Sequence, residues 1–344
     1  QEMVLSQGKL YVVLGEPRTD WKAQKAKRIV SQKHYLPPFE RYSPPAGDKS
    51  LLALEASTGE VLWTNASSEV SSLMPSTLAV DDGRVLFQNT DAIVCLDATT
   101  GQVAWEHPRR VQRSRLAWST PTIVAHDGLV YSADRKAVEK DGEVLWIPSG
   151  GYHEYIRGDV QGELLALDAT TGKRLWSCPA YEGFNAPVDI LITGGRLWTG
   201  RYAWGQDPGI TQGRDPKTGE VVFRRAADQE VMGKFGHARC HRAKATGEYL
   251  VLGRRGVEFV DAEDGGLVAN LFVRGICQYG VLPANGLLYA PPHSCACSVS
   301  DLIKAGYIAL APEREQDEDI QPSASEALEQ NPTFGFRPSA NDSP

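Results

Sequence analysis

One short pattern recurs along the 344-residue chain and sets the spacing of everything between its copies. Its clearest copy, ALDATTGKRLW, runs from Ala166 to Trp176, and two weaker copies end in Phe or Ala instead of Trp. In every copy an acidic residue stands four positions before a turn glycine. The five turn glycines are Gly59, Gly101, Gly172, Gly219 and Gly265. Their successive intervals are 42, 71, 47 and 46 residues, and a period in the forties indicates an array of repeated supersecondary units.

Each copy predicts a β-hairpin. A short apolar strand such as Leu164 to Leu167 leads into a polar turn, where the acidic side chain can accept hydrogen bonds from turn amides. The glycine then supplies the positive φ that other residues resist. A further strand precedes each hairpin, as in DDGRVLFQ at residues 81–88. No periodic helical stretch lies between these strands, so they predict an all-β fold, a β-propeller built from antiparallel blades of about 45 residues each.

The pattern A-x-D-x-x-T-G-x-x-x-W resembles the repeat of the pyrroloquinoline quinone (PQQ) dehydrogenases and their non-catalytic relatives. Those relatives include the propeller lipoprotein of the outer-membrane β-barrel assembly machinery. Three copies match closely and two are degraded, so the resemblance covers roughly residues 8–312. It implies a PQQ-like propeller. It does not imply one activity, because this repeat serves dehydrogenases, scaffolds and sensors alike.

The composition excludes several kinds of partner. The net charge is -7 and the densest basic cluster, at residues 109–115, is short, so we expect no nucleic acid. No apolar run approaches the length that a transmembrane helix needs, so we expect no membrane span. The chain begins at Gln1 without an initiator Met or a signal-like segment, which predicts a mature exported form or a piece of something longer. With the resemblance, this favours a periplasmic or otherwise exported protein.

We expect one propeller domain at residues 1–313, with inserts at about 16–48 and 135–161, and an acidic tail or linker at 314–344. The tail has too few aliphatic residues to offset its ordering entropy, so we expect it to be disordered. Without inserts and tail, the chain has the length for about six blades. The family's rings usually hold more blades. We therefore expect an incomplete ring that packs against a protein partner, a second copy or further blades of a longer chain.

The densest chemistry falls in the last two units. Seven candidate metal ligands lie there in two loops: His237, Cys240, His241, Cys277, His293, Cys295 and Cys297. Zinc takes four such groups and copper or iron would accept them too, yet the spacings match no standard zinc or haem module. A transition-metal or redox site, a disulfide and free thiols all stay open. Cys95, inside a regular unit, is predicted to be a core residue.

Tyr202 and Trp204 stand in a Gly-rich loop and are candidates for stacking on a planar ligand, as a Trp does beneath the quinone in the dehydrogenases that the chain resembles. The resemblance would also imply two adjacent cysteines, ligands for calcium or a lanthanide, and a catalytic Asp. No two cysteines are adjacent here, and no acidic residue maps onto those roles. The repeat carboxylates, such as Asp97 and Asp168, are explained as turn residues. Catalytic residues stay unassigned, and PQQ with calcium ranks behind a transition metal as a cofactor.

These observations favour a non-catalytic or cryptic PQQ-like propeller that acts as a binding or assembly scaffold, with the Cys and His cluster in its last blades. The second hypothesis is part of a PQQ-dependent quinoprotein oxidoreductase. The third is a glycan-binding module that uses exposed Trp and Tyr side chains of the inserts. Whether the chain is an enzyme is left open by the sequence.

Overall fold

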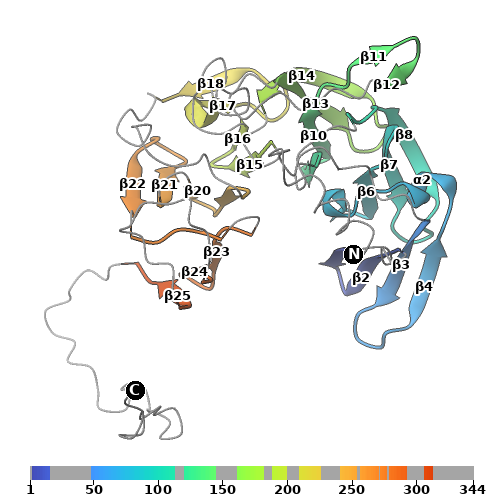
Figure 1. The fold of residues 1–344 in the computed structure, drawn as a ribbon, viewed down its shortest axis with the longest axis horizontal. Coiled ribbons are helices and arrows are strands. Elements are labelled where there is room, and N and C mark those ends of the chain that lie inside the picture. Colours follow the sequence, from blue (N-terminus) through green and yellow to red (C-terminus); the bar gives the residue numbers. More distant parts are fainter. Residues whose placement is uncertain are drawn as a thin grey trace, which may run out of the picture. The chain divides into compact units, whose positions relative to one another are not determined.

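The computed structural model describes residues 2–15, 48–112, 120–144, 161–181, 188–199, 209–225, 241–253, 256–270, 272–276, 279–292 and 306–312. Within these ranges the strands form six antiparallel sheets that follow the chain, together with one small two-stranded hairpin (Figure 1). Five of the six sheets have four strands, and the last has three. This confirms the predicted all-β fold with about six blades.

The first blade consists of β1 (Glu2–Ser6), β2 (Lys9–Gly15), β3 (Lys49–Glu55) and β4 (Val61–Asn65). The second consists of β5 (Ala79–Asp81), β6 (Arg84–Gln88), β7 (Ala92–Asp97) and β8 (Val103–Pro108). The third consists of β9 (Thr122–His126), β10 (Leu129–Arg135), β13 (Gln161–Asp168) and β14 (Arg174–Tyr181). The fourth consists of β15 (Ile190–Thr193), β16 (Arg196–Thr199), β17 (Gln212–Arg214) and β18 (Val221–Arg224).

The fifth blade consists of β19 (Lys244–Ala245), β20 (Tyr249–Leu252), β21 (Val257–Asp261) and β22 (Leu267–Asn270). The sixth consists of β23 (Leu282–Ala284), β24 (Leu287–Ala290) and β25 (Ile308–Leu310). A small hairpin, β11 (Glu139–Lys140) and β12 (Glu143–Val144), stands apart from the blades. Three short helical turns complete the described elements: α2 (Ser68–Ser71), η3 (Pro75–Thr77) and η4 (Gly209–Thr211).

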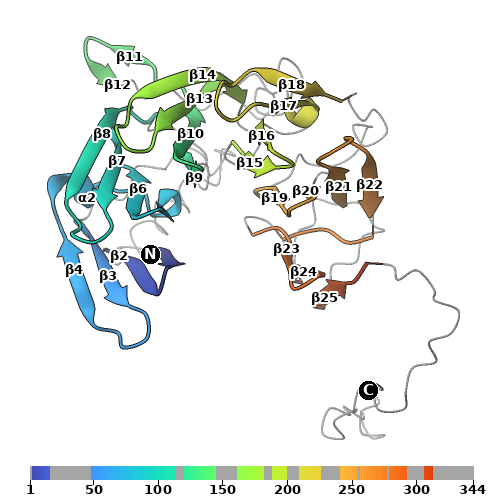
Figure 2. The same cartoon turned by 180° about the vertical axis from the view of Figure 1, so that it is seen from behind.

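Within each blade the strands lie in chain order from one edge of the sheet to the other. The first strands of consecutive blades contact one another in sequence, from β1 to β5, β9, β15 and β19. They are therefore the inner strands, and consecutive blades lie side by side, as Figures 1 and 2 both show. No helix among the described residues has the length and apolar character to cross a membrane.

The repeat residues join each blade to the next. Trp105, at the end of the second repeat, lies against the turn glycine of the third blade, where a Cβ built on Gly172 would be 2.5 Å from the indole ring. The indole Nε1 donates a hydrogen bond of 2.9 Å to the carbonyl of Ala169 in the same turn. Equivalent contacts join the first blade to the second and the third to the fourth. The turn glycine is thus required twice, for its positive φ and for the space that the Trp ring fills.

The core consists of the layers between blades. One cluster contains Leu51 and Ala53 of the first blade with Phe87 and Val94 of the second. The next contains Cys95 and the opposite side of the second blade, packed against Val130 and Leu167 of the third. Cys95 is fully buried, which confirms its predicted place in the core.

The structure also differs from the expectation in detail. The resemblance to the repeat starts at about residue 8, but the first blade begins earlier with β1, because Val4 and its neighbours pair in register with β2. The insert at 135–161 contains the small hairpin of β11 and β12, with Asp141 and Gly142 at positive φ in its turn. The insert at 16–48, apart from Asp48, lies outside the described residues, as does the tail at 314–344. These two boundaries stay predictions.

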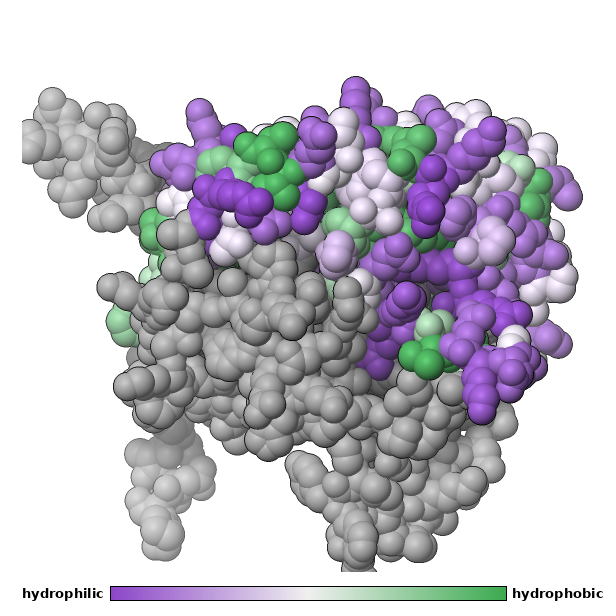
Figure 3. All heavy atoms as spheres, turned by 90° about the horizontal axis from the view of Figure 1, so that it is seen from above, coloured by the Kyte–Doolittle hydropathy of each residue, from purple (hydrophilic) through white to green (hydrophobic). Residues whose placement is uncertain are grey.

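Outer strands carry single apolar side chains on a polar surface. Leu175, Val222 and Val268 are each more than half exposed, on three different blades. In the view of Figure 3, the described surface is mainly hydrophilic, with small separate hydrophobic patches. Scattered apolar residues of this kind are normal for a protein surface and do not mark a site.

Candidate binding face

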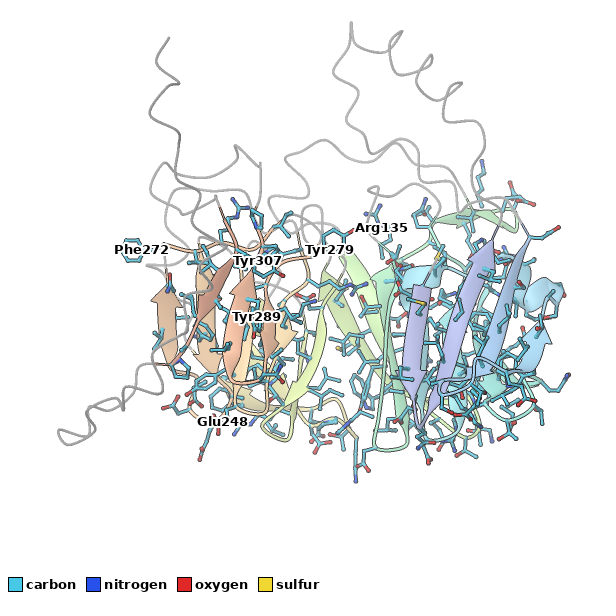
Figure 4. All side chains as sticks on the ribbon, turned by 90° about the horizontal axis from the view of Figure 1, so that it is seen from below. Arg135, Glu248, Phe272, Tyr279, Tyr289 and Tyr307 are labelled. Carbon is cyan, nitrogen blue, oxygen red and sulfur yellow. The ribbon has the colours of Figure 1, made fainter. Side chains whose placement is uncertain are left out.

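The blades have two ends with different chemistry. At the turn face, short turns join the first strand of a blade to the second and the third strand to the fourth. At the loop face, mostly longer connections join the second strand to the third and each blade to the next. The loop face is uppermost in Figure 4, where Arg135, Tyr279 and Tyr307 lie near it and Glu248 lies at the turn face.

Repeat carboxylates at the turn face serve the turns themselves. Asp97 accepts hydrogen bonds from the amides of Thr99 and Thr100 at 2.9 and 2.8 Å and from the Thr100 hydroxyl at 3.0 Å. These bonds, led by the one from the Thr100 amide, hold the pKa of Asp97 below its usual range. Asp168 makes the same set of contacts in the third blade. Both were predicted to be turn residues, and this is confirmed.

Buried polar side chains gather at the loop face. All the buried polar residues of the described chain except Ser132 and Thr193 lie at or near strand ends on this face. Their ionisable members are Lys49, Asp134, Arg135, Asp189, His241, Glu258 and Arg274. Burying such groups is favourable only when each finds partners, so the loop face is held by a polar framework as well as by apolar packing.

Gln88 and Arg109 show how this framework works between the second and third blades. Gln88 is fully buried, and its amide nitrogen lies 2.8 Å from the carbonyl of Ala92 and 2.9 Å from that of Arg109. The Arg109 guanidinium donates to the carbonyl and hydroxyl of Ser132 at 2.8 and 2.7 Å and to the carbonyl of Glu163 at 2.7 Å. Arg109 therefore clamps the end of one blade to the middle of the next, a structural role for a member of the short basic cluster.

Charged and polar residues from three blades meet at the loop-face ends of the inner strands. The Arg242 guanidinium donates to the Thr122 hydroxyl, which donates in turn to the carbonyl of Val188 at 2.6 Å. The Asp189 carboxylate accepts from the amide of Ala243 at 3.2 Å. Burial lowers the pKa of Lys244, and the nearby Asp189 opposes that shift. Two cations and one carboxylate thus share a partly desolvated position.

Sequence reasoning missed this set because Arg242 and Lys244 were assigned to the loop of the Cys and His cluster. The segment that follows His241 contains the strand β19 at 244–245. The available signal was the alternation of Arg242, Ala243 and Lys244, which has the period of two typical of a strand.

Three aromatic side chains at the loop face are exposed to solvent. Phe272 and Tyr279 belong to the connection from the fifth blade to the sixth, and Tyr307 directly precedes β25. They are 67%, 74% and 72% exposed, among the most exposed large apolar side chains of the described residues. Figure 4 shows all three at the loop-face end of these blades.

Of the predicted site residues, the structure describes His241 alone. The stacking candidates Tyr202 and Trp204 lie outside the described residues, and so do six members of the cluster: His237, Cys240, Cys277, His293, Cys295 and Cys297. Among the residues that are described, no group of three or more His, Cys, Asp or Glu side chains is placed to hold a metal ion. The cluster therefore stays a prediction.

His241 is buried between two glycines of the last blades. A Cβ built on Gly253, at the end of β20, would lie 2.2 Å from the imidazole, and one on Gly280 would lie 2.6 Å from it. The ring Nδ1 is 3.0 Å from the carbonyl of Arg242. Because a carbonyl only accepts, Nδ1 carries the proton, and Nε2 would be the metal-binding atom of the neutral ring. The segments next to Cys240 and Cys277 thus meet where His241 contacts Gly280.

Comparisons with known proteins agree with the repeat assignment. A family model described as the outer membrane protein assembly factor BamB matches residues 42–151. A polyvinylalcohol dehydrogenase of Sphingopyxis sp. is 29% identical over 155 residues, which cover 43% of this chain and 22% of that protein. The assembly factor BamB of Burkholderia pseudomallei is 26% identical over 248 residues, covering 70% of this chain and 56% of that one. Among solved structures, a europium-containing methanol dehydrogenase aligns over 90% of the chain at 14% identity, with a TM-score of 0.44.

The five repeats, the six antiparallel sheets and these sequence relatives place the chain in the PQQ-repeat β-propeller superfamily. The chain spans about a fifth of the length of the polyvinylalcohol dehydrogenase and just over half that of the assembly factor.

Proposed function

We propose that the chain is the propeller of an exported binding scaffold, and that its loop face receives a protein partner. The observation that carries this proposal is the group of exposed aromatic side chains Phe272, Tyr279 and Tyr307 on that face. Aromatic residues are enriched in the cores of protein interfaces, where they supply large contact areas at a small cost in conformational entropy. Binding residues also concentrate in loops that a rigid scaffold positions, which describes this end of the blades.

The comparisons support the same choice. The BamB relative, whose name describes an assembly factor, matches a larger share of this chain than the dehydrogenase does. A relative named as an outer membrane protein assembly factor also supports the expectation of a periplasmic protein.

Site-specific photocrosslinking tests the loop face directly. A photoreactive amino acid replaces Tyr279 on the loop face or, as a matched control, Tyr249, an exposed Tyr beside the turn after β19. After irradiation of cells that naturally produce the protein, position 279 should give a discrete crosslinked product and position 249 should not. Crosslinks from position 249 alone, or none from either position, would contradict the proposal.

The quinoprotein oxidoreductase is the second candidate, because polyvinylalcohol dehydrogenase and a quinoprotein ethanol dehydrogenase of Pseudomonas aeruginosa are among the relatives. Equilibrium dialysis against PQQ and calcium, followed by an alcohol oxidation assay with a dye acceptor, separates the two hypotheses. Stoichiometric binding of PQQ together with dye reduction would reject the scaffold hypothesis in favour of the quinoprotein oxidoreductase. A glycan array tests the third class: glycan binding that is lost in Tyr279→Ala would assign the exposed aromatics to carbohydrate.

We propose further that side chains of the Cys and His cluster come together beside His241, where they either bind a transition metal or form a disulfide. The contact between His241 and Gly280 supports this, since it joins the two segments that carry Cys240 and Cys277. Metal content by plasma mass spectrometry, with a thiol count in denaturant, distinguishes the two forms. Cys277→Ser should remove the metal or free one additional thiol, whereas Cys95→Ser, in the core, should change neither the metal nor the other thiols. A wild-type protein with no metal and six free thiols would disprove both the metal site and the disulfide.

A further inference from the structure

Every junction between consecutive blades joins two kinds of surface. One side of each sheet, here called the leading face, packs on the following blade. The other side, the receiving face, accepts the preceding blade. At the junction of the first two blades, Tyr11 and Ala53 belong to the leading face of the first, and Phe87 and Val94 to the receiving face of the second.

The first blade has a receiving face of its own, and no blade among the described residues packs on it. In the second blade this face is formed by residues that are all fully buried: Val85, Phe87, Val94 and Leu96. The equivalent residues of the first blade are only half-buried: Leu10, Val12, Leu52 and Leu54. Beside them on β1, Met3 and Leu5 are 64% and 67% exposed. An apolar sheet face formed by residues of three strands is the kind of surface that another sheet covers.

The repeat turn of the first blade also lacks the neighbouring Trp that covers the equivalent turn of the second blade. Gly59 has a φ of 76°, like the other repeat glycines, but it is exposed, and a Cβ built there would meet no described heavy atom within 4 Å. At Gly101, the equivalent position of the second blade, the ring of Trp63 lies 2.6 Å from that Cβ position. Ala56 is likewise exposed, whereas its equivalent Ala98 is buried and its carbonyl accepts a hydrogen bond from Trp63.

The sixth blade has a leading face that is complementary to this receiving face. Tyr289 occupies in β24 the position that Tyr11 holds in β2 and Tyr131 in β10. Those two tyrosines are buried, and each hydroxyl donates to a carbonyl in the turn of the next blade, at 3.5 and 3.0 Å. Tyr289 is only half-buried, and its neighbours across the sheet, Leu282 and Ala309, are exposed. Figure 4 shows Tyr289 in the middle of this blade.

We propose that the sixth blade of one copy packs on the first blade of a second copy, so that the chain associates head to tail. Tyr289 then donates to the carbonyl of Ala56, and the leading face around Leu282 covers Leu10 and Leu54. The two surfaces belong together because each internal junction is built from the same pair. Met3 and Leu5 of the first blade and Leu282 of the sixth are exposed within one chain, so the sixth blade does not pack on the first blade of its own molecule. A contact of this kind is heterologous and extends from copy to copy.

Sedimentation velocity with charged variants tests this contact. The average mass of the wild-type chain should rise with concentration. Val12→Arg on the receiving face and Leu282→Glu on the leading face should each stay monomeric. Their equimolar mixture should form complexes of two chains and no larger, because each variant retains one intact face. Leu175→Glu, on an outer strand and similarly exposed, is the control that should associate like the wild type. Circular dichroism confirms that each variant is folded.

A milder pair of variants tests the predicted hydrogen bond. Tyr289→Phe should weaken the association about fivefold, whereas Tyr131→Phe removes the same hydroxyl inside the chain and should lower stability without changing the association. A wild-type chain that stays monomeric at all concentrations overturns the proposal, whatever else covers these faces. A dimer that survives Leu282→Glu also overturns it, because that dimer would form without the leading face.

Discussion

Replacing Gly172 by Ala should destabilise the protein much more than the same replacement at Gly59, although the two turns have nearly the same backbone. The φ angles are 68° and 76°, so both substitutions place a Cβ in the left-handed region. They differ in what the new methyl group meets. At Gly172 it would lie 2.5 Å from the Trp105 ring, and at Gly59 it would meet no described atom within 4 Å.

The magnitudes follow from these two contributions. A residue other than glycine in the left-handed region costs roughly 1 kcal/mol, and this applies at both positions. At Gly172 the methyl group must also displace a Trp ring that is buried and hydrogen-bonded to Ala169, and overpacking of this kind costs about 1–3 kcal/mol. We therefore expect a loss of about 1 kcal/mol for Gly59→Ala and about 2–4 kcal/mol for Gly172→Ala.

Urea unfolding followed by circular dichroism measures both losses, at a protein concentration where the chain is monomeric. The slope of the free energy against urea should be unchanged, so that the midpoints report stability. Trp fluorescence should also shift in Gly172→Ala, because the Trp105 ring leaves its place on the turn. If the two variants lose the same stability within about 0.5 kcal/mol, the Trp105 contact does not stabilise the junction and the reasoning is wrong.

Two further predictions concern titratable groups. Burial, the main cause, lowers the pKa of His107 below 6.5, although its Nδ1 donates to the carbonyl of Gly172 at 2.9 Å. The folded state therefore binds a proton more weakly than the unfolded chain, so stability should fall as the pH drops below 6.5, and urea midpoints of His107→Asn should lose part of this dependence. Burial raises the pKa of Cys95 to about 12, so a thiol reagent at pH 8 should modify Cys95 only after denaturant is added, and rapid native labelling would contradict its position in the core.

The sequence was sufficient to predict the blades because residues close together in the sequence determine the structure of each repeat. An acidic residue, a turn glycine and a Trp at fixed spacing specify one hairpin, and Asp97 and Gly101 act in the structure as the turn rules require. The inner strand β1 was missed because five residues before a Gln-Gly turn carry too little pattern to be recognised. The insert at about 135–161 lies between β10 and β13, and its bounds stay a prediction.

The candidate site was harder to predict, since it depends on which loops meet. The period of the repeat places each loop at the loop face but does not say which side chains come together there. His241 was recognised as a possible ligand, whereas its contacts with Gly253 and Gly280 come from two different segments and have no signature in sequence. The same is true of Arg242 and Asp189, which belong to different blades.

The residue that follows the repeat turn changes from Trp to Phe to Ala along the chain, and this makes a prediction about local stability. The first three junctions each have a Trp that lies on a glycine and donates a hydrogen bond. At the fourth, Phe223 takes the place of Trp beside Gly265 and has no N–H to donate, so Arg225 supplies the bond to that turn at 2.9 Å. At the fifth, the equivalent residue is Ala269.

The Phe223 ring is smaller than an indole, and the Ala269 side chain supplies neither a ring nor a hydrogen-bond donor, so local opening should require less free energy towards the last blades. Hydrogen exchange under native conditions should therefore show slower exchange for the amides of β7 and β13 than for those of β21 and β24. The comparison is fair because all four strands are paired on both sides. Equal protection in the second and sixth blades would mean that the Trp contacts are not what holds neighbouring blades together, and that the apolar layers between the sheets are sufficient by themselves.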